Sequence, residues 1–167
     1  YFNRTYKSYS SHRETPYKPI NSIFPAVIQS ENTIFFAHQI DKLYFNHGMR
    51  IHRQIFENAI VELDYQPILK VNNLPSAGKV SLLHQESKNR FVVHLLYSPP
   101  LLRADNVEVI EDFIEIRKVN LELQLDHPIK RVYSIPNGSP LNFEIKKGTL
   151  KVKVPSFTMH TAVVLEY

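Results

Sequence analysis

The hydrophobic positions divide the chain into two parts with different periodicity. Between Ile40 and Leu63, apolar residues recur mostly at steps of three and four among strong helix formers. This spacing predicts one helix, or two helices broken near Gly48. Beyond Gly78 the pattern changes to short apolar runs or to alternation with a period of two, which is typical of β-strands. The clearest case is residues 119–125, where apolar and polar residues alternate strictly, so that one face of the strand is buried.

The second part is therefore predicted to be a chain of strands joined by turns rich in Ser, Asn, Pro and Gly. The expected strands are residues 80–84, 91–97, 107–116, 119–125, 131–135, 141–145, 150–154 and 161–167. No connector of helix length separates them, which favours an antiparallel β-sandwich over a parallel α/β sheet.

The first part begins with residues 1–25, in which three prolines predict an extended, surface-following segment. Residues 26–29 and 33–37 are β-branched or aromatic runs separated by turn formers, and they predict a β-hairpin. Residues 67–78 are expected to be a connector. The fold class is therefore mainly β: a C-terminal antiparallel β-sandwich preceded by a small α+β segment with a hairpin and one or two helices.

Composition narrows the function further. Hydrophobic residues make up 43% and charged residues 22%, as in ordinary globular domains, and no apolar run is long enough for a membrane span. The absence of Cys excludes disulfides and thiolate sites. The charge of +4 is scattered, so no nucleic-acid partner is expected, and with only four Gly no phosphate loop or nucleotide cofactor is predicted. The start at Tyr1 suggests a fragment or a processed chain.

The densest group of chemically active side chains surrounds the predicted helix start. The candidate substrate-proximal or interface residues are His38, Tyr44, His47, Arg50, His52 and Arg53. His47 and His52 are five residues apart, which places them on different faces of a helix, so no metal site is predicted. A general acid or base would need a partner and a cleft that the sequence does not reveal. Buried hydrogen bonds or a domain interface are the plainer interpretation, and contact with substrate from a neighbouring domain or subunit is the alternative.

An acidic run raises the possibility of a glycosidase carboxylate pair. It comprises Glu108, Glu111, Asp112 and Glu115. If residues 107–116 form one strand, these carboxylates divide between its two faces, and no apolar pocket raises the pKa of one of them. A solvated strand or loop edge is expected, and no catalytic residue is assigned. The aromatic residues of the second half are expected mainly in the core, since there is no Trp and most of them lie inside strand patterns.

Several segments together resemble a known family. They are residues 35–40, 44–48 and 52–53, then Asn89 to Leu96 and Val109 to Asp112. In this respect the chain is similar to the C-terminal region of bacterial glycoside hydrolases that resemble the family 42 β-galactosidases and their α-L-fucosidase-like relatives. The resemblance implies a catalytic (β/α)8 barrel, then a flavodoxin-like trimerisation domain and a terminal β-sandwich. Residues 1–66 would be the end of a trimerisation-like domain and residues 67–167 the sandwich, while the catalytic carboxylates belong to the barrel.

The expected function follows from this resemblance. The chain itself would be non-catalytic, an accessory region that supports domain packing or oligomerisation of a glycoside hydrolase. Its expected partners are the upstream catalytic barrel of the same polypeptide and other copies of the chain, in the bacterial cytoplasm or periplasm. The alternative is a carbohydrate-binding β-sandwich module.

Overall fold

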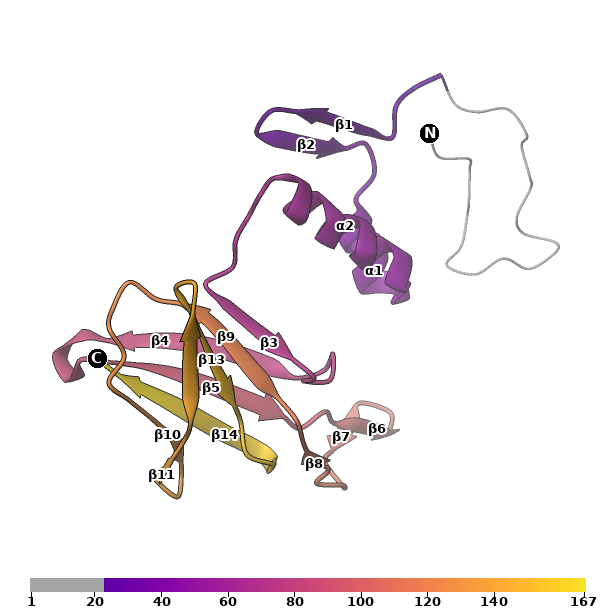
Figure 1. The fold of residues 1–167 in the computed structure, drawn as a ribbon. Coiled ribbons are helices and arrows are strands. Elements are labelled where there is room, and N and C mark those ends of the chain that lie inside the picture. Colours follow the sequence, from indigo (N-terminus) through magenta and orange to yellow (C-terminus); the bar gives the residue numbers. More distant parts are fainter. Residues whose placement is uncertain (1–22) are drawn as a thin grey trace. The chain divides into compact units, whose positions relative to one another are not determined.

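The computed structural model describes residues 23–167, which divide into two compact units (Figure 1). The first unit ends at Gln66, and the second extends from Pro67 to Tyr167. The extended segment expected for residues 1–25 lies almost entirely outside the described residues.

The first unit begins with an antiparallel hairpin of β1 (Val27–Ser30) and β2 (Thr33–Phe36). Ser30 pairs with Thr33, so only Glu31 and Asn32 form the loop, the shortest common hairpin connection. The predicted hairpin is therefore present.

Two helices follow, α1 (Ile40–His47) and α2 (Arg50–Glu62), and they pack against each other. Gly48 separates them. Its φ is +66°, and its backbone N–H donates to the carbonyl oxygen of Tyr44 at 2.8 Å. This left-handed conformation suits Gly because it has no Cβ, and it ends α1. Of the two alternatives from the sequence, the two helices broken near Gly48 are present.

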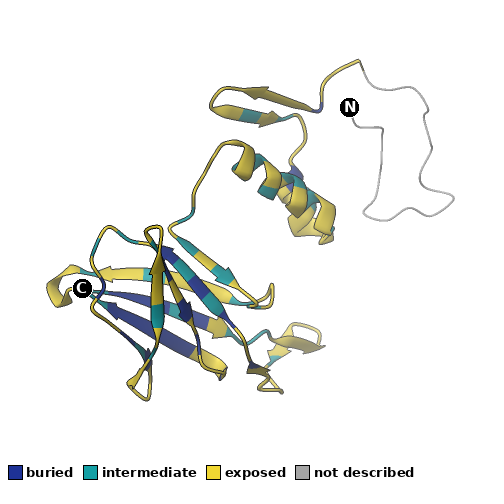
Figure 2. Cartoon of the chain, viewed as in Figure 1, coloured by how far each residue is buried: buried dark blue, intermediate teal, exposed yellow. Residues whose placement is uncertain are grey.

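The first unit has almost no core of its own. Among residues 23–66 only Ala26 and Ile40 are buried hydrophobics, and no residue of α2 is buried (Figure 2). Large apolar side chains instead face outward on the hairpin, on the helices and on the segments beside them. They are Ile23, Phe24, Val27, Ile28, Phe35, Tyr44, Phe45, Ile51, Phe56, Val61, Leu63 and Tyr65. An apolar surface of this extent is typical of an element that packs against another part of a protein.

The second unit is a β-sandwich of two antiparallel sheets. The larger sheet has the strand order β11-β10-β14-β5-β4, with β8 also paired to β14, and the smaller sheet has the order β12-β13-β9-β3. A separate hairpin of β6 and β7, and the 3₁₀ turn η1 (Glu86–Lys88), complete the unit. The strands of the larger sheet are β4 (Lys79–Gln85), β5 (Arg90–Tyr97), β8 (Glu115–Ile116), β10 (Arg131–Ile135), β11 (Ser139–Pro140) and β14 (Phe157–Glu166). The remaining strands are β3 (Leu69–Asn72), β6 (Leu101–Ala104), β7 (Val107–Val109), β9 (Asn120–Gln124), β12 (Phe143–Lys146) and β13 (Thr149–Lys153).

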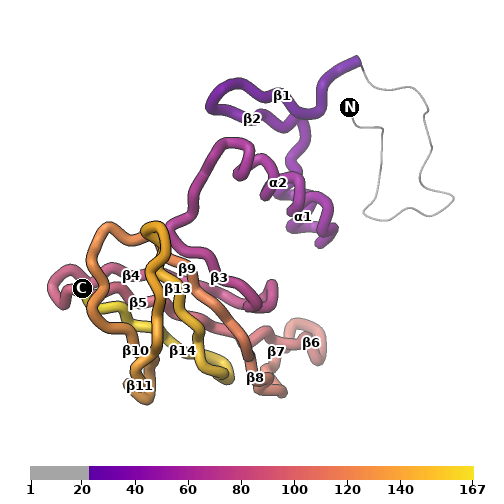
Figure 3. The backbone as a smooth tube through the Cα atoms, viewed as in Figure 1, coloured from indigo at the N-terminus to yellow at the C-terminus, as the bar shows by residue number. Residues whose placement is uncertain are grey.

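The core lies between these two sheets. Its least exposed large side chains, each below 2% exposure or close to it, are Leu95, Leu121, Leu123, Leu165, Val93, Val119, Val132, Val152 and Val163. In β9 the predicted alternation is present, because Leu121 and Leu123 are fully buried while Glu122 points to the other face. β14 lies between β5 and β10, as the backbone trace in Figure 3 shows for the yellow segment. The antiparallel sandwich is thus confirmed.

Several details differ from the sequence-based prediction. The expected connector, residues 67–78, contains β3, and β6 was not anticipated. The single strand expected for residues 107–116 is wrong, because β7 and β8 are short and residues 110–114 between them are irregular. An apolar run indicates that a segment can be extended, but only a pairing partner makes it a strand.

Candidate functional site

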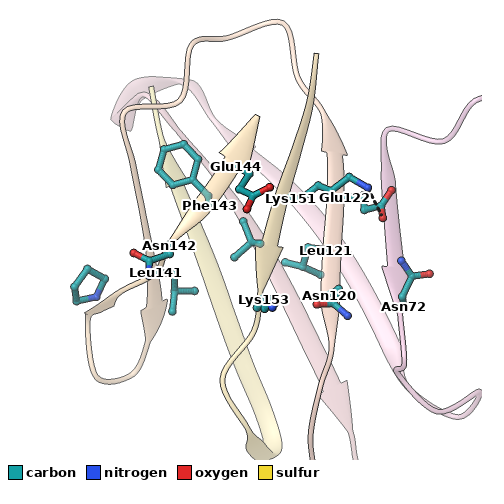
Figure 4. A pocket seen from close by; sticks show the side chains of 12 residues that line it. Asn72, Asn120, Leu121, Glu122, Leu141, Asn142, Phe143, Glu144, Lys151 and Lys153 are labelled. Atoms are coloured by element: carbon teal, nitrogen blue, oxygen red, sulfur yellow. Dashed lines mark hydrogen bonds and ion pairs between the residues drawn. The ribbon is translucent and has the colours of Figure 1, made fainter. Parts of the chain in front are cut away.

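A groove whose lining includes both charged and apolar residues crosses the smaller sheet, and we call it the sheet groove (Figure 4). Its volume is about 620 Å³, within the range of small-molecule sites. Figure 4 shows Asn72 on β3 at one side and Leu141, Asn142 and Phe143 at the other. The lining residues are Asn72, Asn120, Leu121, Glu122, Pro140, Leu141, Asn142, Phe143, Glu144, Lys151, Val152 and Lys153.

Charges of alternating sign cross the sheet in one row. In the strand register Glu144 pairs with Lys151, Lys151 with Glu122, and Glu122 with Lys70. Residues directly opposite on neighbouring strands have their side chains on the same face, within reach of each other. The Lys151 Nζ donates to the Glu122 Oε1 at 3.1 Å, drawn as a dashed line in Figure 4. The row therefore supplies donors and acceptors side by side.

Glu144 has a second cationic neighbour on its own strand. The Lys146 Nζ lies 2.6 Å from the Glu144 Oε2, and this hydrogen bond, with a smaller contribution from the nearby Lys153 and Lys151 charges, lowers the pKa of the Glu144 carboxyl. The same contact raises the pKa of Lys146. Both side chains are exposed, so water and salt weaken the attraction, but its direction keeps Glu144 ionised and able only to accept hydrogen bonds.

Three amide side chains also border the sheet groove. Asn120 is engaged, because its Nδ2 donates to the Lys118 carbonyl oxygen at 3.2 Å. Asn72 and Asn142 make no side-chain hydrogen bond with any of residues 23–167. Each free amide offers one acceptor and one NH₂ donor group, so both are available to a ligand.

A second groove lies between α1 and α2 within the first unit, and we call it the helix groove. Its volume is about 640 Å³. It is lined by Ile40, Asp41, Tyr44, Phe45, Gly48, His52, Arg53, Phe56 and Glu57. The Arg53 Nε donates to the Glu57 Oε1 at 2.7 Å, which raises the pKa of Arg53, and the buried Nδ1 of His52 has no hydrogen-bond partner. The surface combines aromatic side chains with one cation and one free ring nitrogen.

The helix groove brings together only half of the residues predicted from the sequence. Tyr44, His52 and Arg53 line it, whereas His38 precedes α1, His47 ends α1 and Arg50 begins α2. His47 and His52 thus lie on different helices, not on two faces of one helix. Within residues 23–167 no group of three or more His, Asp or Glu side chains is placed to hold a metal ion. No helix in that part of the chain is long and apolar enough to cross a membrane.

Two carboxylates of the acidic run form arginine pairs on the surface. Glu111 forms an ion pair with Arg103, and Glu115 with Arg117. The hydrogen bond from Arg117, followed by that from Ser156, lowers the pKa of Glu115. Because residues 110–114 are irregular, the expected division of these carboxylates between two strand faces does not apply.

Sequence reasoning did not find the sheet groove. The alternation of residues 119–125 placed Asn120 and Glu122 on a wet face, but nothing in the sequence indicated which other residues share that face. The register of β12, β13 and β3 against β9 supplies them.

No protein-family model matches the chain, and neither does any curated protein. Among the solved structures that match is α-L-fucosidase isoenzyme 2 from Paenibacillus thiaminolyticus, with a TM-score of 0.84 and 32% sequence identity over 100% of this chain. The match covers 25% of the fucosidase chain, so the sequence spans about a quarter of that protein's length. This similarity supports the predicted resemblance to α-L-fucosidase-like glycoside hydrolases. The predicted relation to the family 42 β-galactosidases stays a prediction. In sequence and fold the whole chain is therefore similar to one part of a glycoside hydrolase, an α-L-fucosidase.

Proposed function

We propose that this chain is a non-catalytic accessory region of a glycoside hydrolase that supports domain packing or oligomerisation. The observation that carries the proposal is the strong match of the entire chain to only a quarter of an α-L-fucosidase. On this proposal its main partner is the remainder of the same polypeptide, which contains a (β/α)8 catalytic barrel.

The burial of the first unit supports a packing role. In residues 23–66 only Ala26 and Ile40 are buried hydrophobics, while Phe45 is 88% and Val61 is 74% exposed. Removing apolar surface from water stabilises a protein by about 25 cal/mol per Å², so a surface of this kind gains most when a partner covers it. We propose that it is covered by the catalytic part of the polypeptide or by another copy, as in a trimerisation-like domain.

The helix groove is the most specific part of that surface. Tyr44, His52 and Arg53 would be interface residues there, because an aromatic ring, a free imidazole nitrogen and a guanidinium suit the centre of an interface. The alternative is that the cluster from His38 to Arg53 contacts substrate from a neighbouring domain or subunit. Substituting His38 and His47 by Ala in the full-length enzyme, with folding checked, should reduce turnover only on that alternative.

Two experiments test the accessory role. The purified chain should not hydrolyse nitrophenyl fucosides or galactosides. Appreciable hydrolysis that persists after further purification would contradict the proposal. The gene should also encode a (β/α)8 pattern upstream of Tyr1. Expressing the encoded protein with and without residues 1–167 should then show a lower melting temperature, or a changed oligomeric state, for the shortened form. A shortened form with an unchanged melting temperature, oligomeric state and activity would also contradict the proposal.

A carbohydrate-binding module is the second candidate function. It requires an exposed aromatic platform or a polar groove on the sandwich, and the sheet groove meets the second requirement. This role is compatible with an accessory position in a glycoside hydrolase, but it rests on a different surface.

A further inference from the structure

The sheet groove has a lining whose formal charges cancel. It contains two carboxylates, Glu122 and Glu144, and two ammonium groups, Lys151 and Lys153. Phosphates and other anions are usually recognised by an excess of cationic donors, and metal cations by an excess of carboxylates. The lining itself has no such excess, although Lys70 and Lys146 add positive charge beside it. Its balance favours a neutral ligand that makes hydrogen bonds, and an anion is the competing occupant that the experiment below includes.

The arrangement of donors and acceptors indicates the ligand's chemistry. The Lys151 Nζ and the Glu122 Oε1, 3.1 Å apart, present a donor and an acceptor at almost one point. A hydroxyl group both donates and accepts, and two hydroxyls on adjacent carbons can each engage one member of such a pair. The free amides of Asn72 and Asn142 lie at the two sides of the groove, where they can meet hydroxyls further along the same ligand (Figure 4).

One side of the sheet groove is apolar. Leu141 and Phe143 lie there, both partly buried against the core. Phe143 lies opposite the buried Val152, so its ring is on the inner face of the sheet and offers no open stacking platform. An aliphatic side chain such as Leu141 can cover part of the apolar C–H surface of a pyranose, so the affinity should be modest.

We propose that the sheet groove binds a neutral carbohydrate, a mono- or oligosaccharide, through Asn72, Asn142 and the Lys151–Glu122 pair. The inference deepens the carbohydrate-binding role given above as the second function, and it is independent of the packing surface of the first unit. The expected dissociation constant is in the millimolar range, about −4 kcal/mol at 1 mM, because the groove is open to water and offers no open aromatic platform.

Titration of the ¹⁵N-labelled chain by two-dimensional NMR tests this proposal. Lactose and a fucosyllactose serve as neutral probes, and inorganic phosphate as the anionic one. The sugars should cause saturable shifts of backbone amides in β3, β9, β12 and β13. The double variant Asn72→Ala, Asn142→Ala removes two hydrogen bonds of ordinary strength and should weaken binding about tenfold or more.

The matched control is Asn46→Ala, which removes an exposed amide of α1 outside the sheet groove and should leave the titration unchanged. The idea is overturned by an absence of saturable shifts, by equal affinity of the double variant, or by tighter binding of phosphate than of either sugar at the same amides. Spectra of the free variants show whether the fold is intact. A negative result leaves the packing role untouched, since that role is tested by shortening the full-length enzyme.

Discussion

Leu121 offers a quantitative test of how the sandwich is stabilised. It is fully buried in β9, where it pairs across the sheet with Val71 of β3 and Val152 of β13. Leu121→Ala removes three carbon groups, worth about 0.8 kcal/mol each in transfer free energy, or about 2.4 kcal/mol together. The cavity that remains in a packed core adds to this loss, so the expected destabilisation is about 3 to 4 kcal/mol.

A matched substitution separates burial from side-chain chemistry. Leu83→Ala makes the same change in β4, where the side chain is 47% exposed. Because about half of this side chain is already exposed, Leu83→Ala loses only about half of the transfer free energy and leaves no closed cavity. The expected destabilisation is about 1 kcal/mol. The second unit extends from Pro67 to Tyr167, and for a domain of this size each kcal/mol lowers the melting temperature by about 4 to 8 °C. The two variants should therefore melt about 12 to 32 °C and about 4 to 8 °C below the original chain.

Urea and thermal unfolding of the complete chain, followed by far-ultraviolet circular dichroism in the β-sheet region, measure both values. If Leu121→Ala lost less than about 1 kcal/mol, or no more than Leu83→Ala, the assignment of Leu121 to a close-packed core would be refuted. Equal losses would mean that the two sheets do not enclose it.

Three further changes have defined outcomes. Lys146→Met should raise the pKa of Glu144 toward its ordinary 4.5, seen by NMR titration of its carboxyl group. Because the pKa of Glu144 is lowered in the folded chain, the stabilisation by this pair is present above pH 4.5 and is lost on acidification below it. If the Glu144 titration were the same in the variant, the contact with Lys146 would be contradicted. The His94 Nδ1 and the His160 Nε2 lie 3.1 Å apart, within hydrogen-bond distance. A double-mutant cycle with Ala at both positions, measured by urea unfolding, should give a coupling free energy of about 0.5 to 1 kcal/mol. If the two single losses of stability simply added, the hydrogen bond would be refuted. Gly48→Ala should lower the stability of the helices by about 1 kcal/mol through the left-handed φ alone, since the added Cβ meets no neighbouring atom within 4 Å. If the thermal melting curve of the helical signal were unchanged, the left-handed conformation of Gly48 would be contradicted.

The elements that could be predicted from the sequence are those with a long, strict pattern. β9 alternates over its full length because one face is buried in the core and the other is open. β3 was missed because it is four residues long, stands at the edge of its sheet and lies among Pro and Asn residues that favour turns. The break at Gly48 could be predicted, since Gly is the residue that tolerates the conformation found there.

The sheet groove could not be predicted in the same way. Its lining comes from segments as far apart along the chain as Asn72 and Lys153. Their proximity depends on the register of three strand pairings, and local periodicity carries no information about register between distant strands. The His and Arg residues between His38 and Arg53 are close in sequence, but Gly48 separates them onto two helices. Closeness in sequence therefore did not show which of them share one surface.

The central position of β14 has a consequence for biosynthesis. β14 (Phe157–Glu166) is made after the other strands of residues 23–167, yet β5 and β10 both pair with it. Until these residues have been synthesised, the larger sheet lacks its central strand. The unpaired edges of β5 and β10 and their apolar side chains can then form non-native contacts. The sandwich can therefore close only after translation has passed residue 166, and a nascent chain halted before residue 157 should depend on chaperones to remain soluble.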